Sequence, residues 1–222
     1  FPGDELRAMG FEHQAGMGQK GYNGVAILSQ LPLENEGTRH WVGKEDSRHQ
    51  FVTLPGGIEL HNFYVPAGGD EPDRDKNEKF GHKLDFVDEM ASWFPQAHSN
   101  DKPMVLVGDL NIAPLETDVW NHKQLLKVVS HTPIETEKFT AAFEAFGWVD
   151  AMRDKIPADE PLYTWWSYRA RDWRAANKGR RLDHVWVTPP LKDRVRHLEV
   201  VLDARGWEKP SDHAPVMFDI AD

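Results

Sequence analysis

Apolar residues follow two different periodicities along this chain. Over residues 78–94 they recur every three or four positions, which predicts one long amphipathic helix. Short apolar runs at residues 25–28 and 104–107, each next to a glycine-containing turn, predict buried strands. Residues 51–54 and 58–65 flank a Pro-Gly-Gly loop, and the second segment alternates apolar and polar residues, so a β-hairpin is expected there.

Shorter patterns complete this prediction. Residues 139–146 indicate a short helix that ends at Gly147, and residues 182–187 and 215–220 indicate two further strands. Short strands interleaved with helices are typical of an α/β sandwich, in which two sheets pack together with helices outside. Because no fixed-period repeat and no Pro/Gly/Ser-rich linker divides the chain, residues 1–222 are expected to form a single domain.

The composition excludes several classes of protein. A hydrophobic fraction of 40% and a charged fraction of 28% are those of an ordinary folded domain and not of a long disordered tail. No stretch approaches the roughly 18 apolar residues of a membrane-spanning helix, so no membrane partner is expected. The absence of cysteine excludes disulfide scaffolds, thiolate zinc sites and cysteine nucleophiles.

The chain opens at Phe1-Pro2-Gly3, with no initiating Met and no apolar leader. This opening is typical of the interior of a longer chain, and no secretory signal is visible. We expect a cytoplasmic, bacterial-like location and a monomer.

Four polar clusters each lie at the end of a predicted strand or just before one. They are residues 62–66 (Asn-Phe-Tyr-Val-Pro), 108–111 (Gly-Asp-Leu-Asn), 181–184 (Arg-Leu-Asp-His) and 211–215 (Ser-Asp-His-Ala-Pro). Each alone also fits a structural role: a core aromatic, an Asx turn, a surface ion pair, or a helix-cap-like turn with an incidental histidine. Because sites are often built from loops at strand ends, the functional interpretation is that all four converge on one metal and one phosphate.

Asp109 and Asn111 form the first of two informative pairs. They are two positions apart, so an extended backbone points both the same way, and a carboxylate beside a carboxamide suits a hard cation or an oriented water. A calcium loop starting at Asp109 is excluded, because Pro114 and Trp120 stand where that loop needs Gly and Glu. In the second pair, a histidine next to a carboxylate at residues 212–213 is typical of a general base or a metal ligand.

Charge is distributed unevenly along the chain. The net charge is −10, yet residues 165–184 carry six basic and two acidic side chains, a local charge of +4, which leaves −14 for the remainder. Aromatic residues interleave with the basic ones, a combination that suits contact with nucleic-acid phosphates and stacking on an exposed base or sugar. The structural alternative is a Trp-rich loop on the sandwich edge, with arginines stacked on it by cation–π contact.

Taken in order, these motifs resemble the exonuclease III family of apurinic/apyrimidinic (AP) endonucleases, which has the endonuclease/exonuclease/phosphatase fold. The resemblance spans nearly the whole chain and extends to residues 18–28, 147–151, 164–169 and 177–184. It implies a four-layered α/β sandwich that is incomplete at its N-terminus. It also implies a DNA repair nuclease, with Mg²⁺ or Mn²⁺ as cofactor, that hydrolyses phosphodiesters at abasic sites, nicks and 3′ ends of duplex DNA.

The resemblance implies a role for each candidate catalytic residue. Asp109 would orient and deprotonate the attacking water, and Asn111 would help to hold that water. His213 would contact the scissile phosphate and stabilise its developing charge, with Asp183 orienting the imidazole. Tyr64 would contact the phosphate as well.

The resemblance also implies ligands for the substrate and the metal. Trp165 would pack at the pocket for the abasic sugar, with Arg169 nearby. The implied substrate-binding residues are Trp165, Arg169, Asn177 and Arg181, and the implied metal ligands are Asp212, Asp109 and Asn111.

Two departures from the family pattern bear on activity. The residue after Tyr-Val-Pro is usually an amide in the family, and here it is Ala67, so one phosphate or sugar contact is expected to be missing. The family also begins with a strand–helix–strand unit of roughly 30 residues that carries the principal metal-ligating Glu, and this chain starts after it. We therefore expect the 222-residue chain to be weakly active or inactive.

Two other functions remain open at this point. One is a phosphodiesterase of the same fold that acts on lipid or inositol phosphates, although residues 165–181 have no evident use in such an enzyme. The other is a non-catalytic DNA-binding module.

Overall fold

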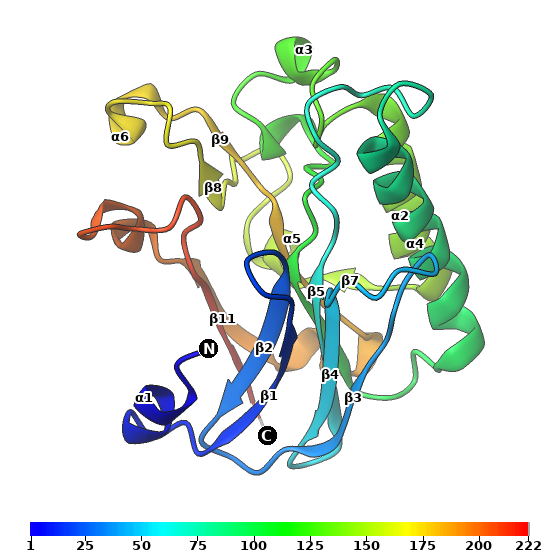
Figure 1. Ribbon diagram of the computed structural model, residues 1–222, viewed down its shortest axis with the longest axis vertical. Helices are drawn as coiled ribbons and strands as arrows, with labels where there is room; N and C mark the ends of the chain where they lie inside the picture. Colours follow the sequence, from blue (N-terminus) through cyan, green and yellow to red (C-terminus); the bar gives the residue numbers. More distant parts are fainter. Residues whose placement is uncertain (222) are drawn as a thin grey trace.

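The computed structural model describes residues 1–221 (Figure 1). Its α-helices are α1 (Gly3–Ala8), α2 (Glu78–Ala97), α3 (His122–Leu125), α4 (Pro133–Phe146), α5 (Ala151–Lys155) and α6 (Trp173–Ala176). Its strands are β1 (His13–Gly18), β2 (Gly24–Ser29), β3 (Glu34–Thr38), β4 (His49–Leu54), β5 (Ile58–Tyr64), β6 (Met104–Asp109), β7 (Val149–Asp150), β8 (Trp165–Trp166), β9 (Gly179–Arg180), β10 (Asp183–Val187), β11 (Val195–Val200) and β12 (Val216–Ile220). Short 3₁₀ helices cover Glu116–Asp118, Pro189–Arg194 and Leu202–Gly206.

Six strands form the central sheet, in the order β3-β4-β5-β6-β10-β7. Neighbouring strands are antiparallel, except that β5 and β6 run parallel and place Tyr64 opposite Asp109. Strand β10 runs antiparallel to β6 and places Asp183 opposite Asp109. Three of the polar clusters therefore meet at one edge of this sheet.

The two faces of the sheet are covered by different elements. Helices α2 and α4 lie over one face, where Met104 and Leu106 of β6 join their core (Figure 1). The paired strands β1–β2 and β11–β12 cover the other face, where Val105 of β6 packs near Leu198 and Phe218. Successive side chains of β6 therefore point into two different cores. The mixed α/β fold predicted from the sequence is confirmed.

Several boundaries differ from the sequence pattern. Helix α4 begins at Pro133 rather than at residue 139, because Thr132 and Glu135 form a capping box and a proline occupies the first turn. Strand β3 was not predicted, since its sequence Glu-Asn-Glu-Gly-Thr is mostly exposed at the sheet edge and carries no apolar alternation. No helix within residues 1–221 combines the length and apolar character needed to cross a membrane.

Gly108 allows β5 and β6 to approach closely just before the site. It has a φ of 134°, and a Cβ at this position would lie 1.9 Å from the backbone oxygen of Phe63. Only glycine accommodates both the conformation and the contact, so Gly108 sets where Asp109 leaves the sheet.

A buried ion pair fixes the loop behind Asp109. Lys83 of α2 and Glu135 of α4 are both 0% exposed and form an ion pair. Lys83 Nζ also donates to the backbone oxygen of Asn111 at 2.8 Å, and Glu135 Oε1 accepts the backbone N–H of Ser130 at 2.9 Å. The two helices and the loop after β6 are therefore held as one unit.

Lys83→Met should lower the free energy of unfolding by about 3–5 kcal/mol, because the Glu135 carboxylate would stay buried without its partner. Urea denaturation measures this change. Lys79→Met, at an exposed position of the same helix, is the control and should change stability by less than about 0.5 kcal/mol. Equal small effects of both substitutions would contradict this role of Lys83.

Candidate active site

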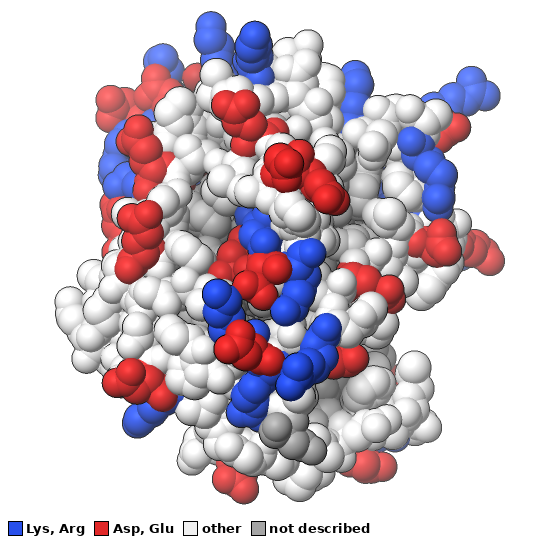
Figure 2. Space-filling view, turned by 180° about the vertical axis from the view of Figure 1, so that it is seen from behind, with Lys and Arg blue, Asp and Glu red and all other residues white. Residues whose placement is uncertain are grey.

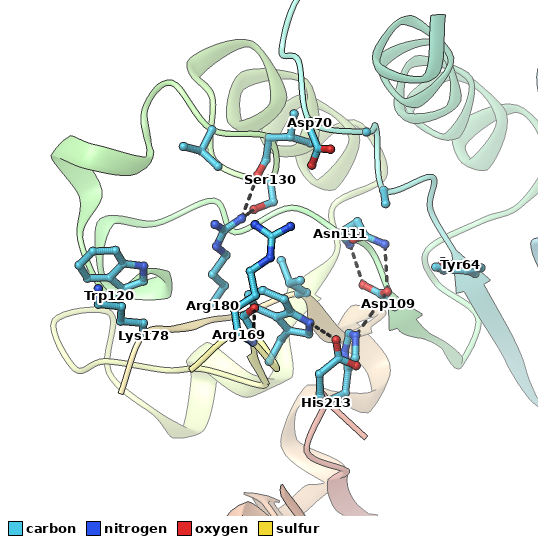
Figure 3. Close-up of a pocket in the computed structure, with 18 residues that line it drawn as sticks. Tyr64, Asp70, Asp109, Asn111, Trp120, Ser130, Arg169, Lys178, Arg180 and His213 are labelled. Atoms are coloured by element: carbon cyan, nitrogen blue, oxygen red, sulfur yellow. Dashed lines mark hydrogen bonds and ion pairs between the residues drawn. The ribbon is translucent and has the colours of Figure 1, made fainter. Parts of the chain in front are cut away.

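A cavity of about 650 Å³ opens where β5 and β6 leave the central sheet. Side chains from all four polar clusters and from the basic aromatic segment line it (Figure 3). Among the predicted residues, the lining includes Tyr64, Asp109, Asn111, Trp165, Arg169, Asp212 and His213. Residues far apart in the sequence therefore meet in one place.

His213 lies between two carboxylates from adjacent strands. Its Nδ1 lies 2.7 Å from Asp183 Oδ2. Its Nε2 lies 3.8 Å from Asp109 Oδ2 (Figure 3). Asp183 is itself positioned by Thr164, whose buried hydroxyl oxygen accepts the Asp183 backbone N–H at 3.0 Å. The backbone of His213 is itself held by an isolated antiparallel bridge to Trp165. The predicted contact of Asp183 with the imidazole is present.

Burial and crowded charges shift the pKa values of this group. Burial, together with the nearby Asp183 carboxylate, raises the pKa of Asp109 to about 7. Burial alone would lower the pKa of His213, but the Asp183 hydrogen bond and the surrounding carboxylates outweigh it and raise this pKa to about 9. At neutral pH His213 is a cation, and Asp109 is able to take up or release a proton.

Asn111 orients the Asp109 carboxylate through a turn. Its backbone is left-handed, with a φ of 54°. Asp109 and Asn111 therefore approach each other through an Asx-type turn, and not along the extended backbone that the spacing predicted. Asn111 Nδ2 donates to Asp109 Oδ2 at 2.9 Å and to the backbone oxygen of Val65 at 3.0 Å. The Asn111 backbone N–H donates to Asp109 Oδ1 at 3.1 Å. Both carboxylate oxygens of Asp109 therefore have fixed donors.

Tyr64 and Asp212 complete the lining near Asp109. Burial and the Asp109 charge raise the pKa of Tyr64, whose ring lies 4.9 Å from the Arg48 guanidinium. Asp212 Oδ2 accepts the indole N–H of Trp165 at 2.9 Å. This bond joins the loop before β12 to the aromatic wall of the cavity.

The site contains a donor set suited to a metal ion. Ligand-type atoms of Asp109, Asp183 and His213 lie within 4.8 Å of one another. The structure therefore places Asp183 beside Asp109, whereas Asp212, predicted as a ligand with Asp109 and Asn111, faces Trp165. Burial and the facing Asp183 carboxylate raise the pKa of Asp109. A divalent cation at the Asp109 oxygens would relieve this repulsion, so the carboxylate donors fit one while His213 stays the charged partner of Asp183.

Two predicted substrate-binding residues are not part of the cavity lining. Arg181 is 1% exposed, and its guanidinium forms ion pairs with Asp118 at 2.9 Å and Asp150 at 2.6 Å. The assignment of Arg181 to substrate binding is therefore corrected, because these pairs hold it inside the fold. Asn177 ends α6 on the surface, where its Oδ1 accepts the Trp166 indole N–H at 3.1 Å.

The cavity wall opposite Asp109 contains the predicted Arg169 and two basic residues that the sequence prediction missed, Lys178 and Arg180. Arg180 lies 5.4 Å from the Trp165 ring centre and donates to Ser130 Oγ at 2.8 Å. Lys178 lies 4.6 Å from the Trp120 ring centre, and Arg169 is exposed at the rim (Figure 3). The basic run in the sequence pointed to this wall, but it could not tell which of two adjacent arginines faces the cavity.

Other parts of the surface have a different charge pattern. On the face shown in Figure 2, Lys and Arg are interspersed with Asp and Glu over the centre, so this face has no large basic patch. The cavity wall instead brings Arg169, Lys178 and Arg180 together on one side of a single opening.

Comparison with known proteins agrees with this geometry. The profile described as the Endonuclease/Exonuclease/phosphatase family matches residues 2–213. The chain belongs to this family. Exodeoxyribonuclease III of Haemophilus influenzae is 29% identical to the chain in an alignment 231 residues long. The alignment covers 97% of this chain and 83% of that protein.

Solved structures of family members superpose on nearly all of the chain. An AP endonuclease from Archaeoglobus fulgidus matches 99% of this chain and 83% of its own, with 30% identity and a TM-score of 0.90. A 3′ phosphatase from Neisseria, bound to a product DNA hairpin, matches 100% of this chain and 84% of its own, with 27% identity and a TM-score of 0.88. The resemblance inferred from the sequence motifs is confirmed.

The raised pKa of His213 can be measured directly. In an NMR titration of the metal-free protein, the His213 imidazole should stay protonated through neutral pH and lose its proton near pH 9. Asp183→Asn removes the charged partner that raises this pKa, so the midpoint should fall toward 6.5. His197, an exposed histidine on β11, serves as the internal reference. An unchanged His213 midpoint in the variant would contradict the assignment of Asp183.

Proposed function

We propose that this chain is a DNA repair nuclease that acts as a monomer and depends on Mg²⁺ or Mn²⁺. It hydrolyses phosphodiesters at abasic sites, nicks and 3′ ends of duplex DNA. The observation that carries the proposal is the cavity in which Asp109 and His213 face a basic aromatic wall, with Asp183 bonded to His213 behind them. The names of its relatives, an exodeoxyribonuclease III, an AP endonuclease and a 3′ phosphatase, support the same chemistry.

Asp109 is the proposed general base. With a pKa of about 7, its carboxylate is suited to take a proton from water at neutral pH as that water attacks phosphorus. Asn111 keeps the carboxylate oriented through the bond from Nδ2 to Oδ2. The bond that breaks joins phosphorus to the leaving ester oxygen.

His213 is the proposed electrostatic partner of the phosphate. It remains a cation at neutral pH because Asp183 holds its Nδ1. A fixed positive donor stabilises the charge that develops on the phosphate oxygens during attack. The Tyr64 hydroxyl is the proposed second contact to the same phosphate.

Oxygen donors on the cavity lining would hold the cation. We propose Asp109, Asn111 and Asp212 for this role, because Asp109 and Asn111 adjoin and Asp212 lines the same cavity although its Oδ2 accepts the Trp165 indole N–H. Mg²⁺ and Mn²⁺ prefer such oxygen ligands. When bound, the cation supplies charge neutralisation at the phosphate and the leaving oxygen.

The basic aromatic wall is the proposed DNA contact. Trp165 would pack against the abasic sugar, while Arg169, Lys178 and Arg180 would pair with backbone phosphates. Arg180 and Lys178 are already held over indole rings, so little side-chain freedom is lost on binding. This wall favours DNA over a lipid or inositol phosphate as the substrate.

The proposal is tested with a duplex that carries one abasic analogue, with Mg²⁺ or with EDTA and with protein in excess so that slow cleavage is detected. Asp109→Asn should lower the cleavage rate by at least about 100-fold, because it removes the general base. Asp193→Asn, at an exposed position outside the cavity, is the control. Equal cleavage rates of the Asp109→Asn variant and the unchanged chain would contradict the proposal, as would preferential hydrolysis of a phosphoinositide.

Two arginines in the basic segment should behave differently. Arg169→Gln should weaken DNA binding and reduce the slope of log affinity against log salt by about 0.9, while stability changes by less than about 0.5 kcal/mol. Arg181→Gln should instead lower stability by about 3–5 kcal/mol, because Asp118 and Asp150 lose their buried partner. Fluorescence anisotropy and urea denaturation separate the two effects. The interpretation fails if Arg181→Gln alters binding but not stability.

A further inference from the structure

A second cluster of ligand-type side chains lies at the start of β5, at the end of the strand remote from the cavity. Glu59 and His61 are two positions apart on β5 and so project to the same face, and His98 is the residue that caps α2 at its C-terminus. Tyr64 ends β5 on the side of the cavity, five residues after Glu59, which is about 17 Å at the usual rise of a strand. The cluster is therefore separate from the candidate active site.

The separations within this cluster match those of a zinc site. His61 Nε2 lies 2.9 Å from Glu59 Oε1, and His98 Nδ1 lies 3.5 Å from the same oxygen. The ligand-type atoms of all three residues lie within 4.8 Å of one another. A tetrahedral zinc ion with bonds of about 2.0–2.1 Å places neighbouring ligand atoms about 3.3 Å apart, between the two observed distances.

We propose that Glu59, His61 and His98 bind a Zn²⁺ ion. Two imidazoles and one carboxylate are a zinc donor set, and the fourth position is left to water. Nitrogen donors favour Zn²⁺ over Mg²⁺, which prefers oxygen ligands. This proposal does not depend on the function of the cavity.

The surroundings of His61 supply the support that a metal-bound imidazole needs. His61 Nδ1 lies 2.8 Å from Nε2 of His49, and both rings are fully buried. With zinc on Nε2, His61 donates its Nδ1–H to His49, as ligating histidines commonly do to a neighbouring acceptor.

The same contacts also set a limit on affinity. In the metal-free protein the indole Nε1–H of Trp41 donates to His49 Nδ1 at 3.3 Å. The proton of His49 is therefore on Nε2, which donates to His61 Nδ1, and the proton of His61 is on Nε2, which donates to Glu59. With zinc on His61 Nε2, the protons move to Nδ1 of both histidines. The Nδ1–H of His49 then faces the Trp41 indole N–H, and two donors meet without an acceptor. This cost makes the site weaker than a zinc site closed by cysteines.

His98 is the ligand that would be fixed by the metal. Its Nε2 is buried and has no hydrogen-bond partner within the described residues, and its Nδ1 lies 3.5 Å from Glu59 Oε1. Since His98 ends α2 and Glu59 begins β5, the ion would tie the helix layer to the central sheet. We therefore expect zinc to stabilise the fold.

The test uses the full chain with His213→Ala as the parent, which removes the nitrogen ligand from the Asp109–Asp183–His213 set, and every sample contains saturating Mg²⁺ so that the oxygen ligands of the cavity are already occupied. Calorimetric titration with ZnCl₂ should show one site, and one equivalent of Zn²⁺ should raise the melting temperature. Adding His98→Ala should weaken the affinity by more than about tenfold and abolish the shift. Adding His197→Ala should change neither, since His197 pairs with Glu199 at 3.5 Å on an exposed strand and this pair is not part of a three-ligand group within residues 1–221.

In the zinc titration, the proposal would be overturned by no Zn²⁺ binding to the parent, or by the same affinity and shift in the parent and the His98→Ala variant. Because His98→Ala could itself disturb the fold, Co²⁺ gives a second readout. The parent should show the visible absorption of tetrahedral Co²⁺, and Glu59→Gln should lose it. A parent without this absorption would also count against the site.

Discussion

Strands β6 and β10 place two carboxylates, Asp109 and Asp183, directly opposite each other at the end of the central sheet. Like charges in a partly buried position are unfavourable unless a cation lies between them, and His213 supplies that cation. The arrangement raises the pKa values of both Asp109 and His213. One register between two strands thus has two results. Asp109 can exchange a proton at neutral pH, and His213 stays an imidazolium.

The surrounding packing keeps this arrangement rigid. Gly108 lets β5 and β6 approach closely, and the Lys83–Glu135 pair holds the loop that contains Asn111. Side chains that act on a substrate need to be held to within a fraction of an ångström, which buried neighbours with fixed hydrogen bonds provide. The stability of the two helices is therefore coupled to the geometry of the cavity.

The cavity wall shows how an acidic protein can present a surface for an anionic polymer. The chain has a net charge of −10, but Arg169, Lys178 and Arg180 all line the same opening. The field near a cleft depends on the charges that line it more than on the total charge. Contacts with Trp120 and Trp165 hold two of these cations in place before any ligand arrives.

Elements and motifs whose signals are local could be predicted before the fold was known. The periodicity of α2, the β4–β5 hairpin, and the residues at the strand ends, including Asp109, Asn111 and His213, depend on neighbours within a few positions. Three other outcomes became visible in the folded chain alone: Arg180 faces the cavity while Arg181 is buried, Asp183 rather than Asp212 stands beside Asp109, and His98 meets Glu59. Those outcomes depend on strand register and on the packing of distant segments, which leave no signal in the local pattern of residues.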